Sequence, residues 1–298
     1  MTKPNLFIVG AGKSGTTALH TYLSEHPQIF MSKIKEPDYF GRESLTTKDT
    51  ADYFDLFSEA GDGMWVGESS TSYLRRVQAA SAIHEYCPDA KIIIMLRNHP
   101  DLIYSFYWQR RMVGQEQKEN FADALLPRPD KNNRTSKPAL YWRLTYSQHI
   151  RRYLDHFGRE NVHLIIYDDF KADTASAYAE TLQFLGVDNF ALPTLKVMNS
   201  RKQVRSGSMQ KLALGVGLNF KTIQRIKRLK FVRVYMEKLM PDFVRNGAMN
   251  IMRKAYYSKE STPPLDQNLR HEMLNYFQSD TDELSQLIGK DLTFWYKQ

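Results

Sequence analysis

The sequence predicts an α/β protein with a P-loop-like three-layer fold, in which a central, mostly parallel sheet is flanked by helices. Three observations carry this prediction. Short apolar runs rich in β-branched residues alternate with segments of helical periodicity. The run 92–96 is continuously apolar, as in strands that are buried on both faces of a parallel sheet. The first apolar run, 6–9, leads through a glycine-rich turn into a helical segment.

That first turn has the layout of a phosphate cradle. Gly10, Gly12 and Gly15 let the backbone turn tightly and approach a ligand. A helix that begins at residue 15 or 16 directs unpaired N–H groups and its positive dipole end toward an anion. The predicted anion-binding residues are Gly12, Lys13, Ser14, Gly15, Thr16 and Thr17.

The spacing differs from the nucleoside-triphosphate P-loop, G-x-x-x-x-G-K-[ST]. Gly10 and Gly15 occupy the two glycine positions and Thr17 the final hydroxyl position, but Thr16 replaces the lysine. The lysine lies inside the loop, at Lys13. There it is placed to stabilise charge on a leaving oxygen rather than to neutralise a terminal phosphate.

The remaining elements follow from the same patterns. Strands are predicted at 28–31, 64–68, 91–97 and 162–168, and helices at 49–57, 79–86, from 100 onward, 141–157 and 175–185. A turn is predicted at 169–173, and two helical segments, through Leu274 and Phe277 and then at 284–287, close the chain. The polar segment 118–140, with three prolines, predicts a long loop. Such a loop suits acceptor specificity, and plain surface disorder explains it equally well.

Composition narrows the class of protein. The net charge of +8 and a pI of about 9.3 suit an anionic ligand, nucleic acid or an anionic membrane. Cys87 is the single cysteine, so the chain forms no internal disulfide, and no Cys/His spacing indicates zinc. No apolar run reaches 18 residues, and the sequence opens without a signal-peptide pattern. We expect a cytoplasmic protein; a domain cut from a longer anchored protein is the alternative.

The segment 207–259 is predicted to be a basic helical insertion in one domain that spans 1–298. Within it, residues 220–240 contain seven Lys or Arg and one Glu, with apolar residues at helical spacing. A helix that packs its apolar face on the sheet is the preferred interpretation. A basic amphipathic helix at a membrane surface or on an anionic acceptor is the alternative.

Charged side chains follow three of the predicted strands. Glu36 lies in the loop after 28–31, Glu68 ends the strand 64–68, and Arg97 ends the strand 91–97. Ligands of open α/β sheets bind at the carboxyl ends of the strands. A carboxylate there suits a general base, and a guanidinium with a nearby hydroxyl, Ser105, suits a dianionic phosphate. A solvent-facing Glu36 and a structural ion pair of Arg97 are the alternatives.

Several stretches resemble the sulfotransferases that use 3′-phosphoadenosine 5′-phosphosulfate (PAPS). Residues 10–19 resemble their 5′-phosphosulfate loop. The segment 35–40, Lys-Glu-Pro-Asp-Tyr-Phe, is similar to a segment of the heparan-type carbohydrate sulfotransferases. Arg97 and Ser105 match the family's 3′-phosphate motif, with the proline one residue later. The run 153–187 and the C-terminal helices extend the resemblance to about two-thirds of the chain.

The resemblance implies a sulfotransferase domain, expected to be a bacterial member, that transfers the sulfuryl group of PAPS to a hydroxyl or amine and releases 3′-phosphoadenosine 5′-phosphate (PAP). The implied acceptor is a carbohydrate or glycoconjugate, anionic or membrane-associated acceptors included, and neither nucleic acid nor a metal is expected. Glu36 is the implied base and Lys13 the implied cation at the leaving group. The 3′-phosphate is assigned to Arg97, Ser105, Arg201 and Lys202, and acceptor contacts to Lys35, Glu68, Tyr73 and Arg110.

Two other functions compete with this interpretation. A P-loop nucleotide kinase would carry its lysine after the second glycine and more often end the strand at 97 with an acidic residue for Mg²⁺. A basic module that binds membrane or nucleic acid would have no use for the glycine-rich loop.

Overall fold

The computed structural model describes residues 3–42, 44–129, 139–191 and 262–296. These residues belong to two compact units. The first unit contains the described residues of 1–102, 144–198 and 271–298, and the second those of 103–143 and 199–270. The segment predicted to be a basic insertion, 207–259, lies outside the described residues. One domain over the whole chain therefore stays a prediction.

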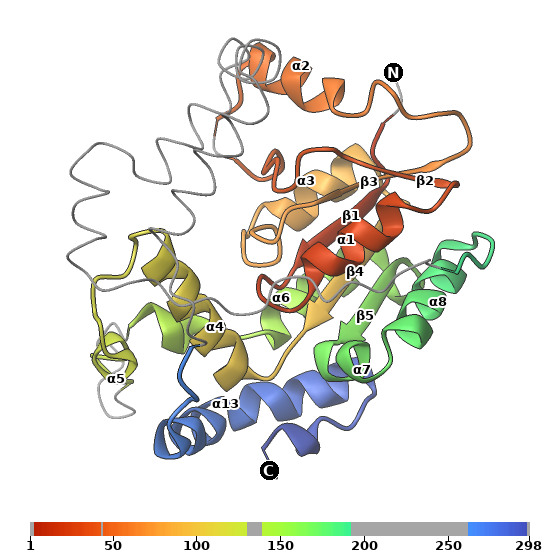
Figure 1. Ribbon diagram of the computed structural model, residues 1–298. Helices are drawn as coiled ribbons and strands as arrows, with labels where there is room; N and C mark the ends of the chain where they lie inside the picture. The colour runs from red at the N-terminus through yellow and green to blue at the C-terminus, as the bar shows by residue number, and fades with distance from the viewer. Residues whose placement is uncertain (1–2, 43, 130–138, 192–261, 297–298) are drawn as a thin grey trace, which may run out of the picture. The chain divides into compact units, whose positions relative to one another are not determined.

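The first unit is built on a parallel sheet, which has five strands in the described part of the chain (Figure 1). The strands are β1 (Leu6–Gly10), β2 (Ile29–Met31), β3 (Trp65–Ser69), β4 (Lys91–Leu96) and β5 (Val162–Ile166). Their order is β2-β3-β1-β4-β5, and every neighbouring pair is parallel. Since the strands are parallel, the segments that follow them all leave from one edge. The loop after β1 thus lies between those after β3 and β4.

Helices cover both faces of this sheet, as Figure 1 shows. One face carries α1 (Thr16–Ser24), α7 (Tyr167–Ala172) and α8 (Thr174–Leu185). There Leu19 and Leu182 join a buried cluster with Ile8, Ile93 and Ile165. The other face carries α3 (Ala79–Tyr86) and α6 (Ser147–Phe157), which contact each other. The predicted three-layer α/β fold is confirmed.

Helix α13 (Gln267–Ile288) anchors the start of α4 (His99–Met112) and of α6 in the first unit. The rings of Phe277 and His99 stack with centroids 4.3 Å apart. The Asp280 carboxylate accepts hydrogen bonds from the amides of Tyr146 and Ser147 at 2.7 and 3.1 Å, and it lies 3.0 Å from His99 Nε2. It therefore satisfies amides at the N-terminus of α6 from a distant part of the sequence.

The second unit collects the aromatic residues of α4. Tyr104 and Tyr107 are buried there beside Phe121, which lies in the short helix α5 (Phe121–Ala124). The Tyr107 hydroxyl donates to the carbonyls of Lys118 and Glu119 at 2.9 and 2.6 Å. Two of the clustered aromatics thus serve as core of this unit.

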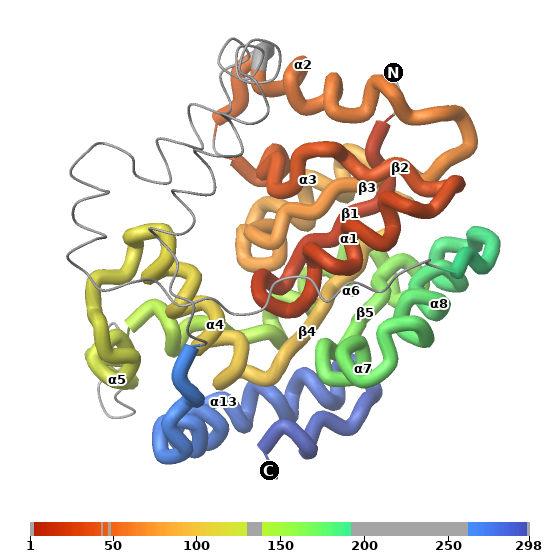
Figure 2. Tube along the Cα trace, viewed as in Figure 1, coloured from red at the N-terminus to blue at the C-terminus, as the bar shows by residue number. Residues whose placement is uncertain are grey.

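Several predicted boundaries were wrong. The helix expected at 141–157 is a 3₁₀ turn (Leu140–Arg143) followed by α6, because Asp280 binds the amides at which α6 begins. The expected turn at 169–173 is α7, and α5 lies within the expected loop. The two closing helical segments form the single helix α13. Figure 2 traces the Cα path of the chain, with α2 (Thr47–Asp55) in orange and α13 in blue.

Candidate active site

The glycine-rich loop leaves β1 at the centre of the sheet and enters α1. The Ala11 amide donates to the Met95 carbonyl of β4 at 2.7 Å, which ties the loop to the neighbouring strand. Gly15, at the N-cap of α1, has a φ of 93°, in the left-handed region that favours glycine. Lys13 also has a positive φ, 73°. The loop is therefore held in a tight curve around the start of α1.

The amides of this loop suit an anion. Among the described residues, no acceptor is found for the amides of Gly12, Gly15, Thr16 and Thr17. Helix α1 has no capping side chain and no acidic residue in its first turn. Free N–H groups and the positive end of the helix dipole both favour an anion at the start of α1. A phosphate or phosphosulfate group fits this donor set.

Arg97 follows β4 and contacts the loop directly. Its Nη1 donates to the Lys13 carbonyl at 3.1 Å, and its Cζ lies 4.7 Å from the centre of the Tyr167 ring. The Asp101 carboxylate lies 3.6 Å from Nη2, so the ion pair considered from the sequence is present as well. The Arg97 side chain is 11% exposed. The structure thus places a second cation beside the loop, while the phosphate that it binds stays a prediction.

Glu36 reaches the same edge from the loop after β2. Its carboxylate accepts from the Thr71 amide at 3.0 Å and from the Thr71 hydroxyl at 3.1 and 3.2 Å, and it pairs with Lys35 at 2.7 Å. Thr71 also borders the glycine-rich loop, because a Cβ built at Gly12 would lie 3.3 Å from its Oγ1. Thr71 therefore contacts both the predicted base and the glycine-rich loop. The Glu36 side chain remains 41% exposed.

Glu68 and Tyr73 are buried beneath this edge, each with no exposed surface. The Glu68 carboxylate accepts from the hydroxyls of Tyr53, Tyr73 and Ser70 at 2.9, 2.8 and 2.6 Å. Burial raises the pKa of Glu68 to about 7, although these hydrogen bonds lower it. Burial, followed by the charge of Glu68, also raises the pKa of Tyr73. The acceptor contacts predicted for Glu68 and Tyr73 stay predictions, and the structure places both in a buried network.

The other predicted residues are spread more widely. Ser14 is fully buried, and its amide donates to the Ala11 carbonyl at 3.3 Å. Ser105 and Arg110 belong to the second unit, where Ser105 is buried in α4 and Arg110 donates to the Gln115 carbonyl at 2.9 Å. The predicted 3′-phosphate residues Arg201 and Lys202 lie outside the described residues.

Two residues near the loop were missed as site residues from the sequence. Tyr167 packs against both Arg97 and the position of a Cβ on Gly15, 3.2 Å away. Thr71 holds Glu36. Both follow strands, β5 and β3, at the edge where ligands of such sheets bind, so the carboxyl-end rule was the signal that could have identified them.

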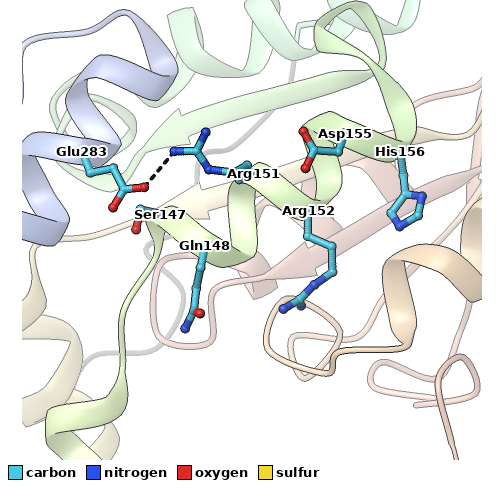
Figure 3. A pocket seen from close by; sticks show the side chains of 7 residues that line it. All are labelled: Ser147, Gln148, Arg151, Arg152, Asp155, His156 and Glu283. Atoms are coloured by element: carbon cyan, nitrogen blue, oxygen red, sulfur yellow. Dashed lines mark hydrogen bonds and ion pairs between the residues drawn. The ribbon is translucent and has the colours of Figure 1, made fainter.

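A separate cavity of about 350 Å³ lies along α6 (Figure 3). The ion pair of Arg151 and Glu283, 2.8 Å, links α6 with α13 at this cavity. Its lining residues are Ser147, Gln148, Arg151, Arg152, Asp155, His156 and Glu283. None of them is a predicted site residue, and we assign the cavity no role.

Comparison with known proteins decides the family. A family profile described as "Sulfotransferase domain" matches residues 3–214. This chain belongs to the sulfotransferase domain family. The predictions of the family, and of a sulfotransferase as the class of enzyme, are therefore confirmed.

Individual sulfotransferases agree with this assignment. The crystal structure of a sulfotransferase from Alicyclobacillus acidocaldarius is 26% identical, covers 99% of both chains and has a TM-score of 0.68. The bifunctional heparan sulfate N-deacetylase/N-sulfotransferase of Drosophila melanogaster is 25% identical over 215 residues, which are 62% of this chain and 20% of that protein. The human enzyme 3 of that name is 27% identical over 195 residues, 62% and 22%. The chain thus spans about a fifth of the length of these two relatives.

Within the described residues of this sulfotransferase domain, every helix is too short or too polar to span a membrane. Within the same residues, no group of three or more His, Cys, Asp and Glu side chains is arranged to hold a metal ion.

Proposed function

We propose that this protein transfers the sulfuryl group of PAPS to a hydroxyl or amine of a carbohydrate acceptor. The observation that carries the proposal is the meeting of three groups at one edge of the sheet. These are the glycine-rich loop after β1, Arg97 after β4, and Glu36 bound to Thr71 after β3. Cation, amides and carboxylate are the groups that sulfuryl transfer requires.

The loop would hold the 5′-phosphosulfate end of the donor. The amides of Gly12, Gly15, Thr16 and Thr17 supply the hydrogen bonds, and Lys13 supplies a positive charge. Arg97 would bind the 3′-phosphate of the donor. The further residues predicted to bind this phosphate are Ser105, Arg201 and Lys202. Because Lys13 and the amides provide the charge at the leaving oxygen, we propose that no metal ion is needed.

Glu36 would act as the general base. A carboxylate accepts about four hydrogen bonds, and Glu36 receives three donors here, namely Lys35 and the amide and hydroxyl of Thr71. One lone pair of the Glu36 carboxylate is left to accept a hydrogen bond from the O–H or N–H of the molecule that receives the sulfuryl group. PAPS, when bound, would supply the sulfuryl group. Glu36 would take the proton of the acceptor's O–H or N–H as that oxygen or nitrogen bonds to sulfur, and PAP would leave with the electron pair of the broken S–O bond.

The acceptor class rests on the relatives named above, which act on heparan sulfate. We therefore propose a sugar hydroxyl or amine. Lys35 beside Glu36 would contact an anionic group of such an acceptor.

The direct test is donor binding followed by transfer. Thermal-shift titration with PAP in EDTA should stabilise the protein, whereas ATP with Mg²⁺ should not. Labelled PAPS is then offered with two chitooligosaccharides, one carrying free amines and one fully N-acetylated, which separates N- from O-sulfation. Stabilisation by Mg²⁺-ATP but not by PAP would favour a kinase and overturn the proposal.

A further inference from the structure

The loop that carries Glu36 has a backbone that needs outside support. Glu36 and Asp38 both have positive φ values, 61° and 59°, in a region that side-chain-bearing residues rarely adopt. Such a conformation persists only where surrounding contacts determine it. The contacts that determine this loop are therefore part of what places the Glu36 carboxylate.

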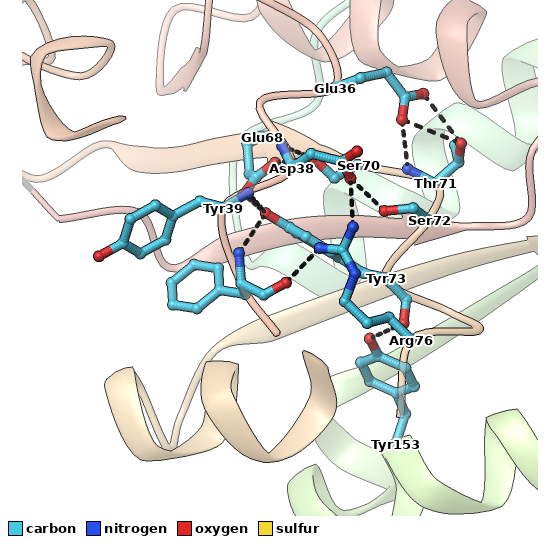
Figure 4. A network of polar contacts seen from close by, with 11 residues as sticks. Glu36, Asp38, Tyr39, Glu68, Ser70, Thr71, Ser72, Tyr73, Arg76 and Tyr153 are labelled. Carbon is cyan, nitrogen blue, oxygen red and sulfur yellow. Dashed lines mark hydrogen bonds and ion pairs between the residues drawn. The ribbon is translucent and has the colours of Figure 1, made fainter. Parts of the chain in front are cut away.

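Three consecutive backbone amides of the loop donate hydrogen bonds to two side-chain hydroxyl groups (Figure 4). The Asp38 amide donates to Ser70 Oγ at 3.0 Å. The amides of Tyr39 and Phe40 both donate to the Tyr73 hydroxyl, at 2.8 and 3.1 Å. The loop is thus held from below by Ser70 and Tyr73.

Both hydroxyls donate their own protons to Glu68. Ser70 reaches Oε2 at 2.6 Å and Tyr73 reaches Oε1 at 2.8 Å. A hydroxyl has one proton and two lone pairs. Because each proton points to the carboxylate, the lone pairs are left for the loop amides. The carboxylate beneath the two hydroxyls therefore orients both of their protons, and the hydroxyl oxygens accept from the three loop amides.

We propose that Glu68 is a positioning residue for sulfuryl transfer, which acts through Ser70 and Tyr73 to hold the loop 36–40 and so the Glu36 carboxylate. This inference rests on the proposed function, in which Glu36 is the base. It differs from a direct catalytic role, because Glu68 is fully buried and all three of its hydrogen-bond partners are hydroxyls of the protein itself.

Tyr53 offers a matched control. Its hydroxyl donates to the same Glu68 oxygen at 2.9 Å, whereas the amides of Asp38, Tyr39 and Phe40 donate to Ser70 and Tyr73 instead. Tyr53→Phe and Tyr73→Phe therefore each remove one buried hydroxyl from Glu68, and only the second removes support from the loop. Glu68→Gln replaces one carboxylate oxygen with an NH₂ group, which only donates. At least one hydroxyl that now donates to Glu68 would then have to accept a hydrogen bond instead.

The test combines amide hydrogen exchange with kinetics. In Tyr73→Phe and Glu68→Gln, the amides of Asp38, Tyr39 and Phe40 should exchange at least tenfold faster than in the wild type, while those of β1 keep their rates. The kcat with labelled PAPS and the chitooligosaccharide that the wild type sulfates best should fall at least tenfold. The Kd for PAP should stay within twofold. Tyr53→Phe should keep both kcat and the loop exchange rates within twofold.

Each outcome is informative. Unchanged loop exchange in Tyr73→Phe, or an equal loss of kcat in Tyr53→Phe, overturns the positioning role while wild-type turnover leaves the proposed function standing. A wild type that neither binds PAP nor turns over shows instead that the proposed function has failed, and with it any role of Glu68 in that reaction. If Glu68→Gln does not fold, Ser70→Ala and Tyr73→Phe carry the test.

Discussion

Replacing Glu68 with glutamine should remove a specific pH dependence from the stability of this protein. Burial raises the pKa of Glu68 from 4.5 to about 7 in the folded state. Between these values the folded protein holds a proton that the unfolded chain has released. The stabilisation of the folded state by this bound proton is therefore fully present below about pH 4.5 and is lost as the pH rises through about 7.

The size of the effect follows from the two pKa values. Each pH unit across the interval changes the free energy of unfolding by about 1.4 kcal/mol, which gives about 3 kcal/mol in total. Urea denaturation of wild type and Glu68→Gln, followed by circular dichroism from pH 4.5 to 8 at constant ionic strength, measures it. The other titrating groups are common to both proteins, so the difference between the two curves isolates Glu68.

The wild-type advantage over Glu68→Gln should shrink by about 3 kcal/mol as the pH rises across this interval. Parallel curves would refute the reasoning, since they would mean that Glu68 takes up no proton on folding. Turnover should change in the opposite sense. The ionised carboxylate is the form that accepts from Ser70 and Tyr73, so kcat should rise with pH toward and through about 7 while stability falls.

Three further substitutions test the site and its frame. Lys13→Ala should abolish detectable turnover and weaken PAP binding, and Glu36→Gln should lose turnover while keeping PAP affinity; labelled-PAPS assays and calorimetry measure both, and near-normal turnover in either contradicts the assigned role. Asp280→Ala should lower the free energy of unfolding by on the order of 3 kcal/mol, because two amides at the start of α6 lose their acceptor; a loss below about 1 kcal/mol by urea denaturation would contradict this.

The glycine-rich loop was predictable because its signal is local. Gly10, Gly12 and Gly15 between an apolar run and a helical pattern leave few alternatives for the backbone. The parallel sheet was predictable for a similar reason, since runs such as 92–96 are too apolar to face water. Arg97 was expected at the carboxyl end of a strand, and the structure places it there, in contact with the Lys13 carbonyl; the 3′-phosphate assigned to it stays a prediction.

The start of α6 was not predictable from neighbouring residues. The aromatic and apolar pattern of 141–157 is compatible with one continuous helix. Asp280, more than 130 positions away in the sequence, decides the boundary by accepting from Tyr146 and Ser147. A long-range hydrogen bond of this kind leaves no trace in local periodicity.

Sequence alone determined the parallel α/β class, the glycine-rich loop with its displaced Lys13, and the resemblance to the family, because these depend on short spacings along the chain. Tertiary structure decided how the two glutamates are placed. Glu36 lies in the loop after β2 and is 41% exposed, whereas Glu68 lies within β3 and is fully buried. The difference arises because Glu68 is part of the sheet and Glu36 is not, and the hydroxyls of Tyr53, Ser70 and Tyr73, which the fold gathers around Glu68, give its buried carboxylate hydrogen-bond donors.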